Sequence, residues 1–381
     1  MYTLVIVLFA ITMQAPEPQL AALRSTIVPL REHANDNREI RGATKELTTA
    51  KHQLRDWIES RLAKFAQDGE QGALAEELHA GVRDSQLFCD DDKECFPSYL
   101  GYLDEIQVNR EDEFLIVETA VGIWCGFDYS AYVYKWNGGR WQRIWENEQN
   151  TYTEKKYLPQ IIHAVQISSP DANGNRLLMT LGARPGCSAA FQPVYFRVWP
   201  MNARNEVQSA PVLDAAEMVS AVDPPIEGRL KPDDVLLTFT VGGTGYGESH
   251  KAVRHFEVRG GRARQVDPIA VTPRDFVEEW LGASWTQSAG RSESASLKPW
   301  HAKLHRDDGQ GDFPDPAMRC TGSSDLWQIG THLHDAPKTY YLVRWRKPYS
   351  FAMVGVSGNP YPDCTIADPK GDEQPAILTQ F

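Results

Sequence analysis

The sequence lacks most of the short motifs that identify an enzyme or a nucleic-acid-binding protein. It contains no CxxC pair, no GxSxG, no GxGxxG and no GxxxxGK[ST]. The sequence therefore gives no support for four kinds of site: zinc ribbons, thioredoxin-type redox centres, serine-hydrolase elbows and the common phosphate loops. An excess of basic residues is also missing, because 39 Lys and Arg face 51 Asp and Glu for a net charge of −12. This balance disfavours nucleic acids and anionic membrane surfaces as main partners.

A long apolar run of the kind that crosses a membrane is missing as well. Residues 2–13 are almost entirely apolar, which is too short for a span of about 20 residues but typical of a secretory signal peptide. No basic residue precedes the run, since the first is Arg24. We expect a signal peptide over residues 1–20, a secreted or periplasmic location, and no transmembrane span beyond this segment if it stays uncleaved. A buried N-terminal strand is the alternative.

The six cysteines support export, because an even number in an exported chain predicts disulfides. One predicted bridge is local, between Cys89 and Cys95. A second joins Cys320 to Cys364 and clamps the C-terminal region. The third joins Cys125 to Cys187, which occupy equivalent positions in two sequence repeats.

Three similar units fill residues 100–270. They are aligned on Leu115, Leu177 and Leu236, and ten residues later come Cys125, Cys187 and Tyr246. The third segment of each unit ends in NGGR at 137–140, PMNA at 200–203 or RGGR at 259–262. Paired glycines favour tight hairpins. An apolar segment such as 161–167 precedes each unit, so each is predicted to hold four antiparallel strands, like one blade of a propeller.

These patterns predict a mainly β protein with α+β additions. We expect a propeller-like or sandwich-like antiparallel β-repeat core, a helical N-terminal segment and a small α+β C-terminal module. The predicted domains are a helical segment at 21–88, a β-repeat domain at 89–270 with units at about 100–155, 160–215 and 220–270, and a module at 271–381.

Both flanking segments contain recognisable helices. In the N-terminal one, an apolar face comprises Leu47, Leu54, Ile58, Leu62 and Phe65, and the other face carries Lys51, Arg55, Glu59 and Lys64. Such a helix packs on a core or binds a partner. In the C-terminal module, Thr272 before Pro273 predicts a capped helix start.

The stretch PDANGNRLLMTLG at 170–182 resembles the repeats of FG-GAP and VCBS β-propellers. Those repeats place an Asp/Asn/Gly calcium loop before a short apolar strand. The resemblance implies a propeller fold and a calcium site at Asp171, Asn173 and Asn175. A plain turn between strands is the alternative, because Gly174 is fourth in the loop and calcium loops place glycine sixth.

The histidines of the C-terminal module are the other candidate metal ligands. His301 and His305 are four residues apart and would share a helix face, and His332 and His334 would share a strand face. With Asp335 they could bind zinc, although exposed histidines are the alternative. No cofactor is predicted beyond calcium or zinc as possibilities.

The sequence favours a non-catalytic protein that binds a ligand outside the cytoplasm. Loops that join repeated strands form natural binding surfaces, and the ligand would be a protein or a carbohydrate. The alternatives are an extracytoplasmic hydrolase that uses the C-terminal histidines and a structural subunit of an envelope complex. The predicted contact residues are Trp124, Tyr129, Trp141, Arg184, Tyr246 and Glu248.

Overall fold

The structure is a computed structural model, and it is mainly β with antiparallel sheets and short helices at the N-terminal side. Contacts divide the chain into two compact units, Met1–Ile161 and Ile162–Phe381. The structure describes residues 17–34, 44–88, 101–123, 126–148, 161–183, 191–220, 227–241, 250–266, 270–305, 315–332, 337–347 and 349–367.

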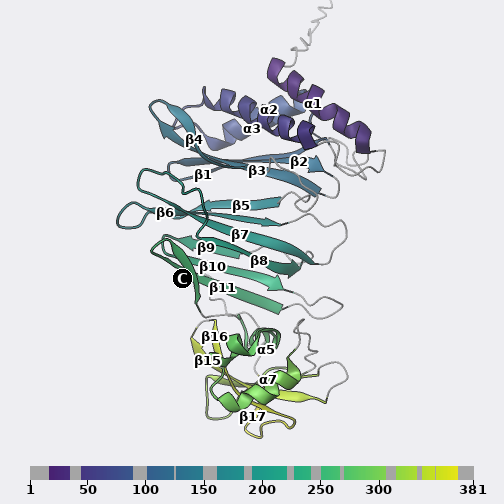
Figure 1. Ribbon diagram of the computed structural model, residues 1–381, viewed down its shortest axis with the longest axis vertical. Coiled ribbons are helices and arrows are strands. Elements are labelled where there is room, and N and C mark those ends of the chain that lie inside the picture. The colour runs from purple at the N-terminus through teal and green to yellow at the C-terminus, as the bar shows by residue number, and fades with distance from the viewer. Residues whose placement is uncertain are drawn as a thin grey trace, which may run out of the picture. The chain divides into compact units, whose positions relative to one another are not determined.

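Unit 1 combines three helices with one four-stranded sheet. The helices are α1 (Pro18–Ala34), α2 (Thr44–Leu62) and α3 (Gln71–Asp84). The strands, in sheet order, are β1 (Leu103–Glu111), β2 (Phe114–Ile123), β3 (Gly126–Asn137) and β4 (Arg140–Asn147). The helices cover one face of this sheet (Figure 1). The first predicted repeat and the helical segment therefore share one core.

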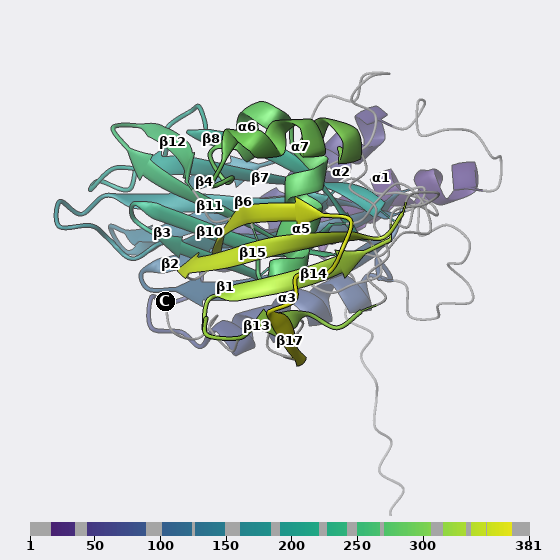
Figure 2. The same ribbon diagram turned by 90° about the horizontal axis from the view of Figure 1, so that it is seen from below.

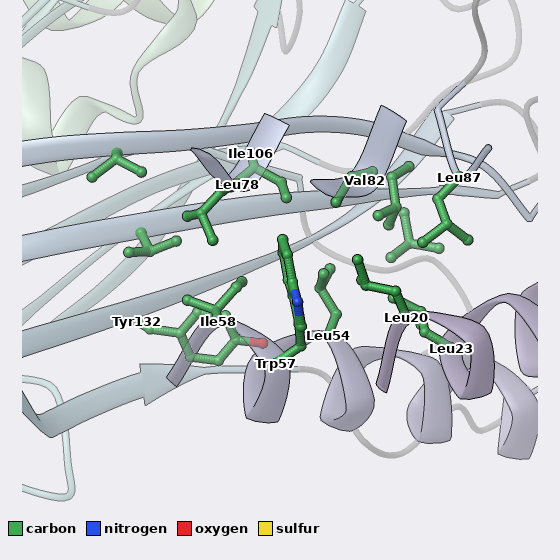
Figure 3. Packing of buried hydrophobic residues seen from close by; sticks show 14 of the residues in the cluster. Leu20, Leu23, Leu54, Trp57, Ile58, Leu78, Val82, Leu87, Ile106 and Tyr132 are labelled. Atoms are coloured by element: carbon green, nitrogen blue, oxygen red, sulfur yellow. The ribbon is translucent and has the colours of Figure 1, made fainter. Parts of the chain in front are cut away.

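The core of unit 1 lies between α1, α2 and the sheet (Figure 3). Trp57 of α2 is fully buried and donates its indole N–H to Glu17 at 3.0 Å. Leu20 of α1 is also buried in this cluster. Residues 18–20, predicted to belong to a signal peptide, are thus part of a packed helix, and residues 1–16 lie outside the described ranges.

The predicted apolar face of α2 is confirmed, but its polar face is not solvated throughout. Leu54 and Ile58 are buried. Lys51, predicted on the opposite face, is also buried, and its Nζ lies 2.8 Å from Asp128 Oδ2 on β3. Lys51 therefore packs against the sheet through this ion pair instead of facing solvent.

The main sheet of unit 2 contains two antiparallel four-stranded meanders. The first comprises β5 (Ile161–Ile167), β6 (Arg176–Ala183), β7 (Phe191–Met201) and β8 (Leu213–Ser220). The second comprises β9 (Glu227–Lys231), β10 (Asp234–Val241), β11 (His250–Arg259) and β12 (Arg262–Val266). They join into one eight-stranded sheet through the pair Val241 and Val219, and β9 lies off the main path of this sheet as a partner of β10.

The two meanders also pack face to face. Phe196 of β7 lies 6.3 Å from Phe239 and 6.0 Å from Phe256, measured between ring centroids. A Cβ on Gly228 of β9 would lie 3.3 Å from the Met179 side chain of β6. Stacked four-stranded meanders are the arrangement of neighbouring propeller blades.

The strand registers agree between the first and third repeats and differ in the second. Leu115 pairs with Tyr134, and Leu236 pairs with His255, so the partner lies 19 residues further along in both repeats. Leu177 pairs with Pro200, 23 residues further along. The middle repeat therefore has four extra residues between these positions. The strand predicted at 161–167 is confirmed as β5.

The predicted glycine hairpins are confirmed in the first and third repeats, and the second repeat turns slightly later and without glycine. Gly138 and Gly139 have φ of 58° and 87°, and Gly260 and Gly261 have φ of 57° and 71°. This left-handed conformation is the one that tight hairpin turns require. In the second repeat the chain turns over residues 202–206, where the Asn202 N–H donates to the Glu206 carbonyl and Met201 bridges Val207, and β8 begins only at Leu213.

The C-terminal module packs helices on one face of a five-stranded sheet (Figure 2). Its helices are α5 (Pro273–Gly282), α6 (Trp285–Ala289), the short 3-10 helix η2 (Ala295–Leu297) and α7 (Lys298–Leu304). Its strands, in sheet order, are β16 (Ser350–Ser357), β15 (Thr339–Lys347), β14 (Leu326–Thr331), β13 (Met318–Cys320) and β17 (Cys364–Ala367).

Two local predictions for this module are confirmed. Thr272 caps α5, because its Oγ1 accepts the Asp275 N–H while the Asp275 carboxylate accepts the Thr272 N–H. Cys320 and Cys364 form a disulfide between β13 and β17. Within the described ranges, no helix has the length and apolar character needed to cross a membrane.

Candidate functional site

Two of the six predicted contact residues lie within the described ranges. Tyr129 is half-buried near the start of β3. Trp141 of β4 is 7% exposed and packs edge-on against Trp136 at 5.5 Å. This burial gives Trp141 a packing role in the core of unit 1 instead of the predicted ligand contact. The other four, which lie outside the described ranges, are Trp124, Arg184, Tyr246 and Glu248.

Tyr129 has structural equivalents in the other two repeats. It pairs across the strands with Ala120, five residues after the aligned leucine of the first repeat. The same position in the second repeat is Gly182, which pairs with Tyr195. In the third repeat it is Val241, which pairs with His250. We call Tyr129, Tyr195 and His250 the third-strand row; all three are partly exposed.

The third-strand row follows the segments that were predicted to form binding loops. Residues 124–125, 184–190 and 242–249 join the second strand to the third in each repeat and lie outside the described ranges. In the first repeat, Phe127 packs edge-on against Tyr129 with a centroid distance of 6.3 Å. Aromatic rings with a polar edge can stack on a flat apolar surface and form a hydrogen bond at the same time.

His250 belongs to a charged cluster that connects β11, β8 and α5. Its Nε2 lies 3.1 Å from Glu279 Oε1. Arg254 donates to both oxygens of Glu279, at 3.1 and 3.3 Å, and to Glu217 Oε1 at 2.7 Å. The carboxylate of Glu279 therefore orients the imidazole ring, while the guanidinium of Arg254 holds that carboxylate.

Burial and charge oppose each other in this cluster. Burial raises the pKa of Glu279, but Arg254 and His250 outweigh it and lower that pKa to about 2. Burial lowers the pKa of Arg254, but Glu279 and Glu217 raise it above its ordinary value. Burial raises the pKa of the neighbouring Asp275, although the Lys251 and Thr272 N–H groups donate to it. Glu279 and Arg254 thus stay charged at neutral pH.

Unit 1 contains a second ionisable cluster between α2 and the sheet. Besides the pair of Lys51 and Asp128, it contains Arg55, whose guanidinium lies 3.2 Å from the Glu148 carboxylate. The same carboxylate accepts a hydrogen bond from the Tyr132 hydroxyl. Burial, reinforced by Glu148, raises the pKa of Tyr132 well above its ordinary value, so this hydroxyl stays protonated. These groups are enclosed and bonded to one another, which is the arrangement of a structural network.

The C-terminal histidines contact helix α5. His301 Nε2 lies 3.0 Å from the Trp280 carbonyl, and His305 Nδ1 lies 2.7 Å from the Leu281 carbonyl. Their rings stack at 5.2 Å, and burial lowers the pKa of His301. They bind carbonyl groups at the C-terminal end of α5. His332 is exposed, and the other predicted zinc ligands, His334 and Asp335, lie outside the described ranges.

The segment Asp171–Asn175 forms a closed turn. Asp171 Oδ1 accepts the N–H groups of Asn173 and Asn175, at 2.8 and 2.7 Å, and its Oδ2 accepts the Asn175 side chain at 3.1 Å. These hydrogen bonds lower the pKa of Asp171, and the calcium site at this turn stays a prediction. In the part of the chain that the structure describes, no three His, Cys, Asp or Glu residues group as metal ligands.

The remaining predicted disulfides stay predictions, because the four cysteines involved lie outside the described ranges: Cys89, Cys95, Cys125 and Cys187. Sequence reasoning missed Tyr195, His250 and the Arg254–Glu279 contact. Tyr195 could have been found by allowing four extra residues in the middle repeat. Glu279 had no signal, because its partners are 25 and 29 residues away in the chain.

No protein-family model matches the chain, and no curated protein matches it. Solved structures resemble it distantly. One, described as a glycoside hydrolase, is 9% identical over 66% of this chain and 72% of its own, with a TM-score of 0.26. A glycosyl hydrolase from Bacteroides ovatus is 10% identical over 66% of this chain and 86% of its own, with a TM-score of 0.16. At such scores neither fold nor activity can be transferred to this chain.

Proposed function

We propose that the chain is a non-catalytic binding protein of the cell exterior or periplasm in which Tyr195 and His250 of unit 2 contact the ligand and Tyr129 offers an equivalent, separate contact in unit 1. The observation that carries the proposal is the register: Tyr129, Tyr195 and His250 occupy one equivalent position in three repeats. Trp124, Arg184, Tyr246 and Glu248 are predicted to contribute from the adjoining loops.

A carbohydrate is the ligand class that suits these side chains. Tyrosine rings stack on the apolar faces of sugars, and phenol and imidazole groups exchange hydrogen bonds with hydroxyls. In the third repeat, Glu279 fixes the orientation of the His250 ring. A hydrogen bond from His250 to a sugar would therefore not cost the entropy of ordering that ring on binding.

The location outside the cytoplasm is supported by the disulfide between Cys320 and Cys364. Disulfides persist in oxidising compartments and are rare in the cytosol. The predicted signal peptide agrees with this location.

The test is binding of soluble polysaccharides, such as β-glucan, mannan and xylan, followed by titration of the strongest binder with variants. We expect Tyr129→Ala and Tyr195→Ala each to weaken binding roughly tenfold, which corresponds to about 1.4 kcal/mol. Tyr340→Ala is the matched control, because Tyr340 is a half-buried strand tyrosine of the C-terminal module. Circular dichroism checks that each variant folds.

Equal loss of binding in Tyr340→Ala and in the row variants would show that the effect is not specific to the row. Unchanged binding in both row variants would exclude the third-strand row as the contact surface.

A further inference from the structure

The hairpin that joins β11 to β12 carries three exposed arginines; Figure 2 labels both strands. Arg259 pairs directly across the strands with Arg262, and Arg264 follows on the same face, opposite Glu257. Residues paired across two strands, or two apart along one, lie about 5–7 Å apart on a sheet face. We call these arginines the arginine hairpin.

This charge arrangement is unfavourable for the fold alone. Like charges directly opposite each other on neighbouring strands destabilise a sheet. Glu257 lies 3.3 Å from Arg259, whose side chain is still 78% exposed. Asp234, which pairs with Glu257 on this face, already binds Arg229 and His255. The hairpin is therefore a cationic site on a chain whose net charge is −12.

The first repeat shows that the turn itself does not need these arginines. In its NGGR hairpin, Asn137 pairs with Arg140, and Lys135 pairs with Gln142. The glycines have the same left-handed conformation as in the third repeat. Asn137 and Gln142 thus occupy the positions of Arg259 and Arg264, which makes those residues fold-compatible replacements.

The surroundings of the arginine hairpin select among anionic partners. Residues 259–262 and 264–265 are all exposed and polar or glycine, whereas protein interfaces need a less charged, apolar centre. The only exposed large apolar side chain in the described ranges is Trp345, on β15, so the hairpin has no apolar anchor for a membrane. A linear polymer with regularly spaced carboxylates needs neither an apolar centre nor an apolar anchor, because arginine binds carboxylates in a bidentate manner.

We propose that the arginine hairpin binds an acidic, carboxylate-bearing polysaccharide. This surface is separate from the third-strand row and does not depend on it. Arg259, Arg262 and Arg264 contact successive carboxylates of one chain, and binding weakens as salt concentration rises, because salt screens exposed charges.

The test uses the full chain and alginate as the acidic probe, with neutral dextran, anionic phospholipid vesicles and polyglutamate alongside. We expect wild type to bind alginate best. The double variant Arg259→Asn/Arg264→Gln, which copies the first repeat, should weaken this binding roughly tenfold, since each exposed ion pair contributes modestly. The control Arg83→Gln/Arg204→Gln removes two other exposed arginines and the same charge, and it should leave binding unchanged.

Four outcomes would overturn the proposal. In the first, the wild-type chain does not bind alginate. In the second, it binds vesicles or polyglutamate as tightly as it binds alginate. The control weakens binding as much as the hairpin variant, which would indicate a general charge effect. The hairpin variant keeps its alginate affinity and self-associates in light scattering, which would mean that the arginines only protect the edge strand β12 from pairing. Loss of dextran or β-glucan binding in Tyr129→Ala is a separate result and concerns only the third-strand row.

Discussion

The ion pair between Lys51 and Asp128 allows a quantitative test of unit 1. Lys51 Nζ and Asp128 Oδ2 are 2.8 Å apart, and neither side chain is exposed. Lys51→Met keeps most of the apolar stem and removes the ammonium group that lies against the buried carboxylate of Asp128. Removing one partner of a buried ion pair costs about 3–5 kcal/mol. For a unit of this size, that loss corresponds to a fall of roughly 10 °C in the midpoint of thermal unfolding.

Removing both charges should have a much smaller effect. The desolvation of two ions offsets most of their attraction, so an apolar pair of similar volume is often neutral or stabilising. We expect Lys51→Met/Asp128→Leu to unfold within about 1 kcal/mol of wild type. Asp128→Leu alone should also cost about 3–5 kcal/mol, because it leaves the ammonium group of Lys51 without this carboxylate. The coupling between the two sites, obtained from the double-mutant cycle, should therefore be at least about 5 kcal/mol.

Urea unfolding, with hydrogen exchange of α2 and β3 to locate the transition, measures these differences. Lys45→Met is the matched control, because Lys45 is an exposed lysine of the same helix and should change stability by less than about 0.5 kcal/mol. Two results would refute the reasoning: a loss of under 1 kcal/mol in Lys51→Met, or a double variant as unstable as the single one.

Two further predictions concern unit 2. The pKa of Glu279 is about 2 in the folded chain against an ordinary value of 4.5. The ionised carboxylate therefore contributes about 3 kcal/mol to stability above pH 4.5, and this contribution is lost as pH falls towards 2. In urea unfolding, the loss of stability between pH 6 and pH 2 should be smaller in Glu279→Gln than in wild type. An equal difference would contradict this assignment. The disulfide between Cys320 and Cys364 closes a separation of 44 residues, so Cys320→Ser/Cys364→Ser should lose about 2–4 kcal/mol in urea unfolding. If reductant lowers the stability of this variant as much as that of wild type, the stabilisation comes from another bridge.

The sequence predicted features that depend on neighbouring residues. The strand at 161–167, the glycine hairpins at 137–140 and 259–262 and the capped start of α5 are all confirmed. Alternation along a strand, positive φ at a turn and a side chain that caps its own helix act within a few residues. The turn of the second repeat lies at 202–206 instead of 200–203, because the four extra residues of that repeat shift it along the chain.

Only the tertiary structure decided which polar residues act together. Lys51 reads as a solvated helix position, yet β3 places Asp128 beside it. Tyr195 and His250 became equivalents of Tyr129 only through strand register, and Glu279 meets Arg254 only because α5 packs near β11. The sequence by itself determined the repeated strands, their turns and the acidic balance of the chain. Pairing between distant segments decided the charged clusters and the third-strand row, because such contacts depend on packing geometry that no local pattern encodes.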